Sequence, residues 1–295
     1  MGKTVRMLSK DGFVQACAID ARDIVERAHE IHGTSATASA ALGRALAIAS
    51  LIGGSIKTEG GSVTLQFSGD GVGGTLIAVS EANGAVRGCV QNPEADVPRK
   101  TNGKLDVGAF IGHNGRLTVI KDLRMHDPYV GSVALAGGEV AEDVAAYYAE
   151  SEQVPSVVAA GVLVQPGGHI AAAGAYIIQL MPGYDADTAE QLERAVYGAG
   201  TVTDMLSAGL SPEGMLLRIL DGFGMRTVDE YMAAYECSCS RERVERALIS
   251  TGEQALSEMI EDGKGAEVTC RFCDSVYTFS DDDLRELLRN AQGRS

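Results

Sequence analysis

Four cysteines near the C-terminal end have the types and spacing of a single metal site. They form two tight pairs, CSC at 237–239 and CRFC at 270–273. Zinc prefers four soft ligands in a tetrahedron, and two short pairs supply them once an intervening fold brings the pairs together. A site of four thiolates leaves no open position for an activated water, so its metal would be structural or redox-regulatory rather than hydrolytic. The spacing therefore predicts one zinc ion bound by Cys237, Cys239, Cys270 and Cys273.

Other interpretations of these cysteines compete with zinc. Structural disulfides would suit a secreted domain, but residues 1–16 contain no apolar run of the kind found in a signal peptide. The pair at 270–273 could serve a thiol-disulfide oxidoreductase, which needs a βαβ context and a lowered thiol pKa. Its flanks instead predict strand, knuckle and strand, and Arg271 is opposed by Asp274. A purely structural zinc module for docking stays open as well, and it predicts no change of activity on oxidation.

The remaining two cysteines lie apart from the quartet. Cys17 and Cys89 each stand alone in an apolar, strand-like stretch. A single thiol in such a setting is typical of a buried and chemically inert side chain. We therefore expect neither of them to take part in the metal site.

Composition limits the partners of this chain. Its 295 residues include 40 acidic residues against 25 lysines and arginines, a formal net charge of −15. That balance disfavours nucleic acid as a partner. A membrane span needs about 20 predominantly apolar residues. Even the stretch 38–56, which is rich in apolar residues, contains Arg44. With no export signal evident, we expect a cytoplasmic protein without a membrane segment.

Residues 1–180 carry the pattern of an α+β domain with antiparallel sheets and packed helices. Short alternating or apolar runs predict strands, and the Asn-Gly dipeptide at 83–84 is a strong hairpin signal. Strands and helices do not alternate regularly, which disfavours a doubly wound sheet. The predicted strands are 62–68, 75–80, 85–90, 117–120, 131–135, 157–164 and 170–179.

Two helices are predicted within this first domain. Thr34 can cap an alanine-rich helix that runs to about Leu51, and 139–151 reads as the second, with acids in its first turn. The glycines at 69–74 satisfy the spacing of a dinucleotide-binding loop. Too few residues follow them, before the turn at 83–84, for the crossover helix such a site requires. We therefore interpret 69–74 as a connection between antiparallel strands.

In residues 181–234 the spacing of apolar side chains changes to the period of a helix. Asp187 or Thr188 can begin a helix that runs to Val196, and Ser211 followed by proline is a helix start. A third helix is predicted to open at 227–230. Glycines interrupt this segment, so it should depend on its neighbours for stability. Its apolar residues need a cover, which we expect to be the adjacent domain.

Residues 235–295 form a small zinc-binding domain around the four cysteines. The pattern predicts helices at 241–250, 253–259 and 284–289, and strands at 267–269 and 276–279. Large apolar residues are few here, so this part cannot bury a stable core unaided. Metal binding would therefore supply folding free energy.

Several short motifs outside the cysteines are shared with one known family. They are ALGR at 41–44, GDG at 69–71, VRG at 86–88, PYVG at 128–131 and, most specifically, the stretch 138–156. Together with both cysteine pairs, these motifs make the whole chain resemble the 33 kDa heat shock protein family of redox-regulated holdase chaperones. The resemblance implies an ATP-independent chaperone for unfolding proteins under oxidative stress, with no enzymatic activity.

The resemblance also implies how such a chaperone is controlled. Members hold zinc through four thiolates when reduced and inactive, and oxidation releases the zinc. On this chain the disulfides would be Cys237–Cys239 and Cys270–Cys273. Unfolding of the metal domain would then destabilise the helical segment and expose apolar surface to client proteins, and the active form would be a homodimer. Nothing in the resemblance concerns Cys17 or Cys89.

Overall fold

The computed structural model describes residues 1–292, which form two compact units. The first unit is Met1–Glu236, and the second begins at Cys237. Residues 181–236 group with the first unit, and the predicted division at 180 and 234 into three domains stays a prediction.

Ten strands of residues 1–292 form one sheet in the first unit. Their order is β7-β6-β3-β4-β5-β10-β1-β2-β9-β8. Neighbours pair in antiparallel fashion except β10 and β5, which pair in parallel where Ala234 and Tyr235 lie beside Ala85 and Val86. The sheet is thus two antiparallel halves joined at that point. The strands are β1 (Gly2–Leu8), β2 (Val14–Asp20), β3 (Ser62–Ser68), β4 (Leu76–Glu81), β5 (Ala85–Val90), β6 (Arg116–Asp122), β7 (Tyr129–Ala134), β8 (Ser156–Val164), β9 (Ile170–Leu180) and β10 (Arg226–Tyr235).

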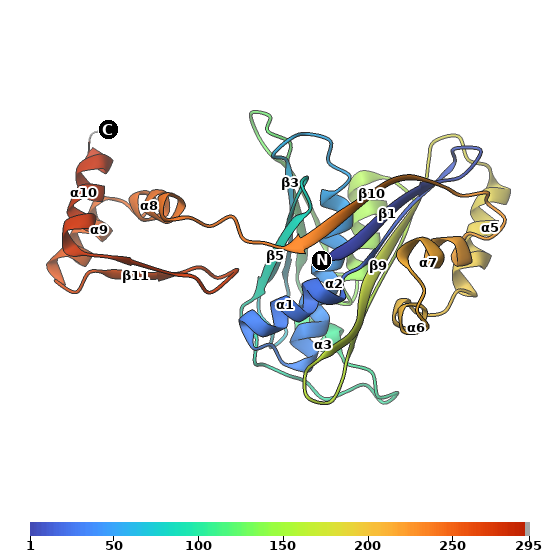
Figure 1. Ribbon diagram of the computed structural model, residues 1–295, viewed down its shortest axis with the longest axis horizontal. Coiled ribbons are helices and arrows are strands. Elements are labelled where there is room, and N and C mark those ends of the chain that lie inside the picture. The colour runs from blue at the N-terminus through green and yellow to red at the C-terminus, as the bar shows by residue number, and fades with distance from the viewer. Residues whose placement is uncertain (293–295) are drawn as a thin grey trace. The chain divides into compact units, whose positions relative to one another are not determined.

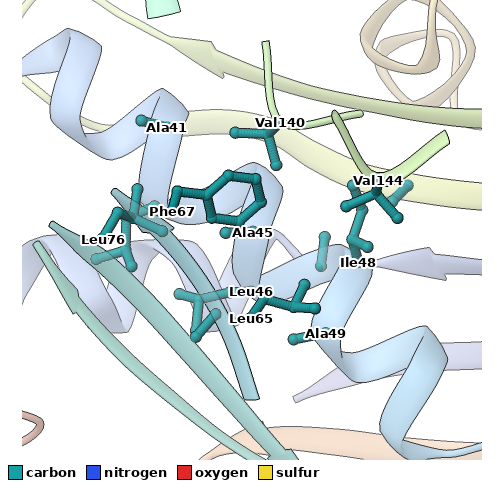
Figure 2. Close-up of a cluster of buried hydrophobic side chains, with 14 of the residues drawn as sticks. Ala41, Ala45, Leu46, Ile48, Ala49, Leu65, Phe67, Leu76, Val140 and Val144 are labelled. Atoms are coloured by element: carbon teal, nitrogen blue, oxygen red, sulfur yellow. The ribbon is translucent and has the colours of Figure 1, made fainter. Parts of the chain in front are cut away.

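One long helix fills the space between the two halves of the sheet. Helix α2 (Ala36–Gly53) contacts β3, β4 and β5 of one half and β2, β8 and β9 of the other. Its small side chains allow this close approach: a Cβ at Gly43 would lie 2.9 Å from Val162 Cγ2 of β8. Figure 2 shows Leu46 of α2 beside Leu65 of β3, within a cluster that includes Phe67. Although α2 is long and apolar enough to cross a membrane, 89% of it is buried, as in a core helix.

Shorter helices complete this inner core. Helix α1 (Arg22–His32) packs on α2, and α3 (Val107–Ile111) also contacts it. Helix α4 (Ala141–Tyr147) continues into a π-helical turn, η1 (Tyr148–Glu152), and the segment ends at Gln153 with φ of 57°. Val140 and Val144 bring this segment onto the core side of α2 (Figure 2).

A second apolar core lies on the outer face of β1, β2 and β9. Helices α5 (Ala186–Tyr197), α6 (Val202–Ser207) and α7 (Pro212–Ile219) lie along that face (Figure 1). Their side chains at Met205, Met215 and Leu216 are buried against strand residues such as Val5 and Ile178. The adjacent domain therefore covers the apolar residues of this segment, as expected. We call the strand surface beneath α5–α7 the outer apolar face.

The second unit contains a hairpin and three helices. Strands β11 (Ala266–Thr269) and β12 (Val276–Phe279) pair in antiparallel fashion, and the helices are α8 (Arg241–Ser250), α9 (Glu253–Glu261) and α10 (Asp281–Gln292). Its buried core is small and consists of Val244, Leu248, Leu256, Phe279, Leu284 and Leu287.

Many local expectations are confirmed by these elements. Strands β3, β5 and β12 and helix α8 have the predicted bounds, and α7 begins after the Ser211 cap. The glycines at 69–74 connect β3 and β4, an antiparallel pair, so this loop is not part of a βαβ unit. The predicted helix at 139–151 is present but is divided into α4 and η1.

Other expectations are wrong. The third helix, expected to open at 227–230, is strand β10, since this stretch pairs with β1 along its length. The cap of α2 is Ser35, whose side chain accepts from the Ala38 amide, whereas the Thr34 hydroxyl lies 2.6 Å from that of Ser39. The sequence patterns also did not predict β1, α1, α3 or α6, and of β2 they indicated only the strand-like stretch around Cys17.

Candidate metal centre

Two separate backbone segments of the second unit carry the four cysteines. Cys237 and Cys239 lie on the extended stretch that leads into α8, where the Ser240 side chain caps the helix by accepting from the Arg243 amide. Arg243 also donates to the backbone carbonyl of Ser238, at 2.9 Å. These contacts fix the chain on both sides of Cys239.

The second pair lies in the turn between β11 and β12. The Cys270 amide donates to the Ser275 carbonyl at 2.9 Å, and the Cys270 carbonyl accepts from the amide of Asp274 at the same distance. Asp274 has φ of 56°, a left-handed conformation that tightens the turn. The predicted strand, knuckle and strand are therefore confirmed, and both thiols of this pair project from one turn.

Arg241 ties the two segments together. At the start of α8 it donates to the Thr278 carbonyl at 2.9 Å and lies 3.2 Å from the Asp283 carboxylate. Its guanidinium group stands 4.4 Å from the centre of the Phe279 ring. One side chain thereby connects α8, β12 and α10, which holds the two cysteine pairs in register.

The four sulfur atoms gather in one cluster. All lie within 4.8 Å of one another, with Cys237 Sγ 3.7 Å from Cys270 Sγ and Cys239 Sγ 3.4 Å from Cys273 Sγ. A tetrahedral zinc with bonds of about 2.3 Å would separate its sulfur ligands by about 3.8 Å. The donor set and the size of the cluster therefore fit a closed four-thiolate site, and these residues could hold a metal ion.

Burial and hydrogen bonding shift the pKa of three of the four thiols in different directions. Burial raises the pKa of Cys237 and that of Cys270. Burial would also raise the pKa of Cys273, but hydrogen bonding with Ser275 outweighs this effect and lowers the pKa to about 7. Thiolates are the metal-binding and nucleophilic form of cysteine, so Cys273 ionises more readily near neutral pH than Cys237 or Cys270.

Tyr277 is a participant that the sequence patterns did not indicate. Its hydroxyl donates to Cys239 Sγ at 3.1 Å, and this contact raises the pKa of Tyr277 to about 12. Such a hydrogen bond from outside the ligand set orients a thiolate and tunes its charge. The alternation along β12, which places Tyr277 and Phe279 on one face, was the available signal.

Cys17 and Cys89 lie in the first unit, on β2 and β5. Burial raises the pKa of Cys17 to about 12, so its thiol stays protonated at neutral pH. This agrees with the inert role expected for Cys17.

Comparison with known proteins identifies the family. Residues 2–280 match the family model described as Hsp33 protein. The chain belongs to the Hsp33 family. Curated Hsp33 relatives include the 33 kDa chaperonin of Clostridium perfringens, 42% identical over 291 residues that cover 98% of this chain and 91% of that protein. The 33 kDa chaperonin of Clostridium beijerinckii is 42% identical over 290 residues, 98% of this chain and 99% of the relative.

A solved structure of the Hsp33 family has the same fold. The 33 kDa chaperonin (heat shock protein 33 homolog) of Thermotoga maritima matches with a TM-score of 0.88 at 32% identity, covering 99% of each chain. The mixed α/β architecture of this chain, with its large sheet, is therefore that of Hsp33. The family is one of chaperones and is non-enzymatic, which leaves the oxidoreductase interpretation of the pair at 270–273 without support.

Proposed function

We propose that this Hsp33 protein is a redox-regulated, ATP-independent holdase, which binds unfolding proteins and prevents their aggregation under oxidative stress. The observation that carries the proposal is the cluster of four sulfur atoms within 4.8 Å, in a unit with a small core of its own. A stability switch requires such a unit, one that is marginal by itself and depends on a reversible cross-link.

In the reduced and inactive state, one zinc ion per chain would be held by Cys237, Cys239, Cys270 and Cys273. The bound ion would contribute folding free energy, on the order of 10 kcal/mol for small metallo-domains. The chain's own contribution is to bring the thiols together, through the turn at 270–275 and through Arg241. Tyr277 would keep the Cys239 sulfur oriented.

Oxidation would convert the quartet to two disulfides, Cys237–Cys239 and Cys270–Cys273. For each pair, a thiolate attacks peroxide to give a sulfenic acid and hydroxide, and the partner thiol then displaces hydroxide. Two electrons leave each pair, and each peroxide ends as two waters. The folded cluster also brings sulfurs of different pairs close together, at 3.4 Å for Cys239 and Cys273 and 3.7 Å for Cys237 and Cys270. Sequence neighbours are favoured because they stay together once the unit opens.

Strand β10 would carry the signal to the helices. It follows α7 in the chain and ends at Tyr235, two residues before Cys237, and its last residues pair with β5 in parallel over two residues. Tyr235 anchors this end, donating to the Gly88 carbonyl at 2.8 Å. We infer that unfolding of the second unit frays β10 from this end and weakens the attachment of α7.

The outer apolar face would then receive client proteins. Helices α6 and α7 span six and eight residues, too short to be stable without the face they cover. Their release uncovers buried residues of β1, β2 and β9 such as Met7 and Ile178. A contiguous apolar surface of this kind is typical of a site for unfolded chains.

The remaining features of the proposal concern assembly and compartment. The active form would be a homodimer, as the family resemblance implies. Four thiols kept available as ligands suit the reducing cytoplasm. With a net charge of −15 we propose neither nucleic acid nor membrane as a partner. The same charge would help keep client complexes in solution.

Zinc content and light scattering of a thermally unfolding client test the proposal. Both are measured on reduced protein and on protein treated with hydrogen peroxide at elevated temperature. We expect about one zinc per chain, lost on oxidation together with newly suppressed aggregation. A Cys17→Ser variant is the matched control and should behave as the parent does, whereas Cys270→Ser should lose zinc without oxidant. Zinc retained after peroxide, or equal suppression in both states, would contradict the switch.

A further inference from the structure

The large sheet ends in an unusually apolar edge strand. Strand β8 (Ser156–Val164) is last in the strand order, and its nine residues include no charged side chain and no proline. Proteins usually protect a sheet edge with charges, proline or a very short strand, because an open edge invites pairing with another chain. Leu163, 44% exposed, even places a large apolar side chain there.

The pairing of β8 with β9 indicates which backbone groups face outward. The Leu180 amide donates to the Pro155 carbonyl at 3.1 Å, which makes these residues a hydrogen-bonded pair. In an antiparallel ladder such pairs alternate, so the amide and carbonyl groups of Ala160 and Val162 point away from β9. Across residues 1–292, no backbone hydrogen bond from outside the β8–β9 ladder reaches them.

A groove runs along this edge. Its volume is about 400 Å³, and residues 160–164 form its floor. Arg44 of α2 lines it from the inner side of the sheet, and Thr203 of α6 from the outer side. Because walls from both faces of the sheet meet at β8, the groove follows the strand edge itself. We call this space the edge groove.

The charges around the edge groove favour a particular occupant. Two cations, Arg99 and Lys104, line it against one carboxylate, Asp204. Arg44 also lines it, but its charge is paired with that of Glu139 at 2.6 Å. This cationic site lies on a chain whose net charge is −15. A second copy of the chain would bring the same negative charge to the interface, whereas an apolar segment with its own carboxylate would complement the groove.

We propose that the edge groove binds an extended, apolar segment of an unfolding protein, carrying a carboxylate, as an additional strand beside β8. Backbone groups of the segment would pair with Ala160 and Val162, and the carboxylate would lie near Lys104. Strand addition of this kind tolerates many sequences, because the main chain supplies the affinity.

This inference rests on the proposed function and adds a second contact to it. Val157 and Ala159 of β8 pack on the same side as the outer apolar face, so an added strand would extend that face. Helix α6 forms one wall of the edge groove while it is docked. Its release would therefore open the groove and the outer apolar face together.

Hydrogen exchange on the oxidised, full-length protein tests the proposal. The probe is a synthetic peptide of alternating valine and threonine with aspartate at one end. We expect it to slow exchange at the Ala160 and Val162 amides by roughly tenfold, the effect of one hydrogen bond. A peptide methylated at alternate backbone nitrogens should give no protection. Lys104→Glu should weaken peptide binding, whereas Lys57→Glu, an exposed site outside the groove, should leave it unchanged.

The outcomes separate this inference from the proposed function. Peptide binding without protection at these amides would refute strand addition at β8, even if oxidised protein still suppresses aggregation. Protection that appears without peptide and grows with protein concentration would mean that a second copy occupies the groove, which refutes the proposed occupant. Failure of oxidised protein to suppress aggregation would refute the holdase. Protection of the Ala160 and Val162 amides is measured with the synthetic peptide and needs no client protein, so the two results are independent.

Discussion

Truncation of one buried leucine should activate the chaperone without oxidation. Leu216 of α7 is fully buried, at 0% exposure, in the core between the helices and the outer apolar face. Leu216→Ala removes three carbon atoms from this core and leaves a cavity. Substitutions of this kind cost roughly 2–5 kcal/mol. Because α7 has eight residues and cannot persist undocked, the whole cost falls on its attachment.

The size of the effect follows from that cost. A loss of about 3 kcal/mol multiplies the population of the undocked helix by roughly one hundredfold. Amides of α7 should exchange faster by a similar factor, since local opening governs their exchange. Reduced Leu216→Ala protein should then partly suppress aggregation of a thermally unfolding client, at an unchanged zinc content.

The neighbouring residue provides a matched control. Leu217 lies on the same helix but is 46% exposed. Leu217→Ala makes the same chemical change at a cost of about 1 kcal/mol or less, because little apolar area leaves water there. This variant should resemble the parent in both hydrogen exchange and light scattering.

Two results would refute the reasoning. If α7 exchanges no faster in Leu216→Ala than in Leu217→Ala, burial of Leu216 does not hold the helix. If α7 opens but the reduced variant leaves aggregation unchanged, the face beneath the helix is not where clients bind. Zinc content measured on the same samples excludes an effect through the cysteine cluster.

Further predictions concern the metal and the first unit. A chelator added to reduced protein should abolish the calorimetric unfolding transition of the second unit and spare that of the first; two unchanged transitions would contradict metal-dependent folding. Asp143 is fully buried and accepts hydrogen bonds from four backbone amides. Asp143→Ala should therefore lower the free energy of unfolding, measured by urea denaturation, by roughly 3–5 kcal/mol. Glu142→Ala, at an exposed neighbouring position, should lower it by far less. Burial opposes ionisation of Glu139, but Lys100 and Arg44 outweigh it and hold its pKa below the ordinary 4.5. Its stabilisation is therefore present at neutral pH and is lost as pH falls through the lowered pKa. Glu139→Gln should cost roughly 1.5–3 kcal/mol at pH 7 and flatten the acid dependence of stability, and an acid profile like that of the parent would show the pairing to be unimportant.

The elements that the sequence predicted well are those specified by nearby residues. The Asn-Gly turn at 83–84 lies between two alternating strands, and β5 has the predicted bounds. Ser211 with the following proline marks the start of α7. Turn chemistry and helix caps act within a few residues, so a linear pattern contains the whole signal.

The elements that were missed or wrong depend on distant partners. The stretch 227–230 has acids that suit a helix start, yet it is a strand because β1, at the other end of the chain, pairs with it. Strand β1, which was not predicted, likewise takes its place from its pairing with β10. Pairing over such separations overrides weak local preferences, and no short window of sequence contains it.

The sequence by itself determined the chemistry of this protein. The types and spacing of Cys237, Cys239, Cys270 and Cys273 indicate a closed thiolate site, since soft ligands in short pairs need little more than a turn to present them. The tertiary structure decided what such a site can control. It placed short helices over an apolar sheet face, paired β10 with β1, and left β8 at the edge of the sheet. These arrangements arise from strand order and burial, which depend on contacts between residues far apart in the chain.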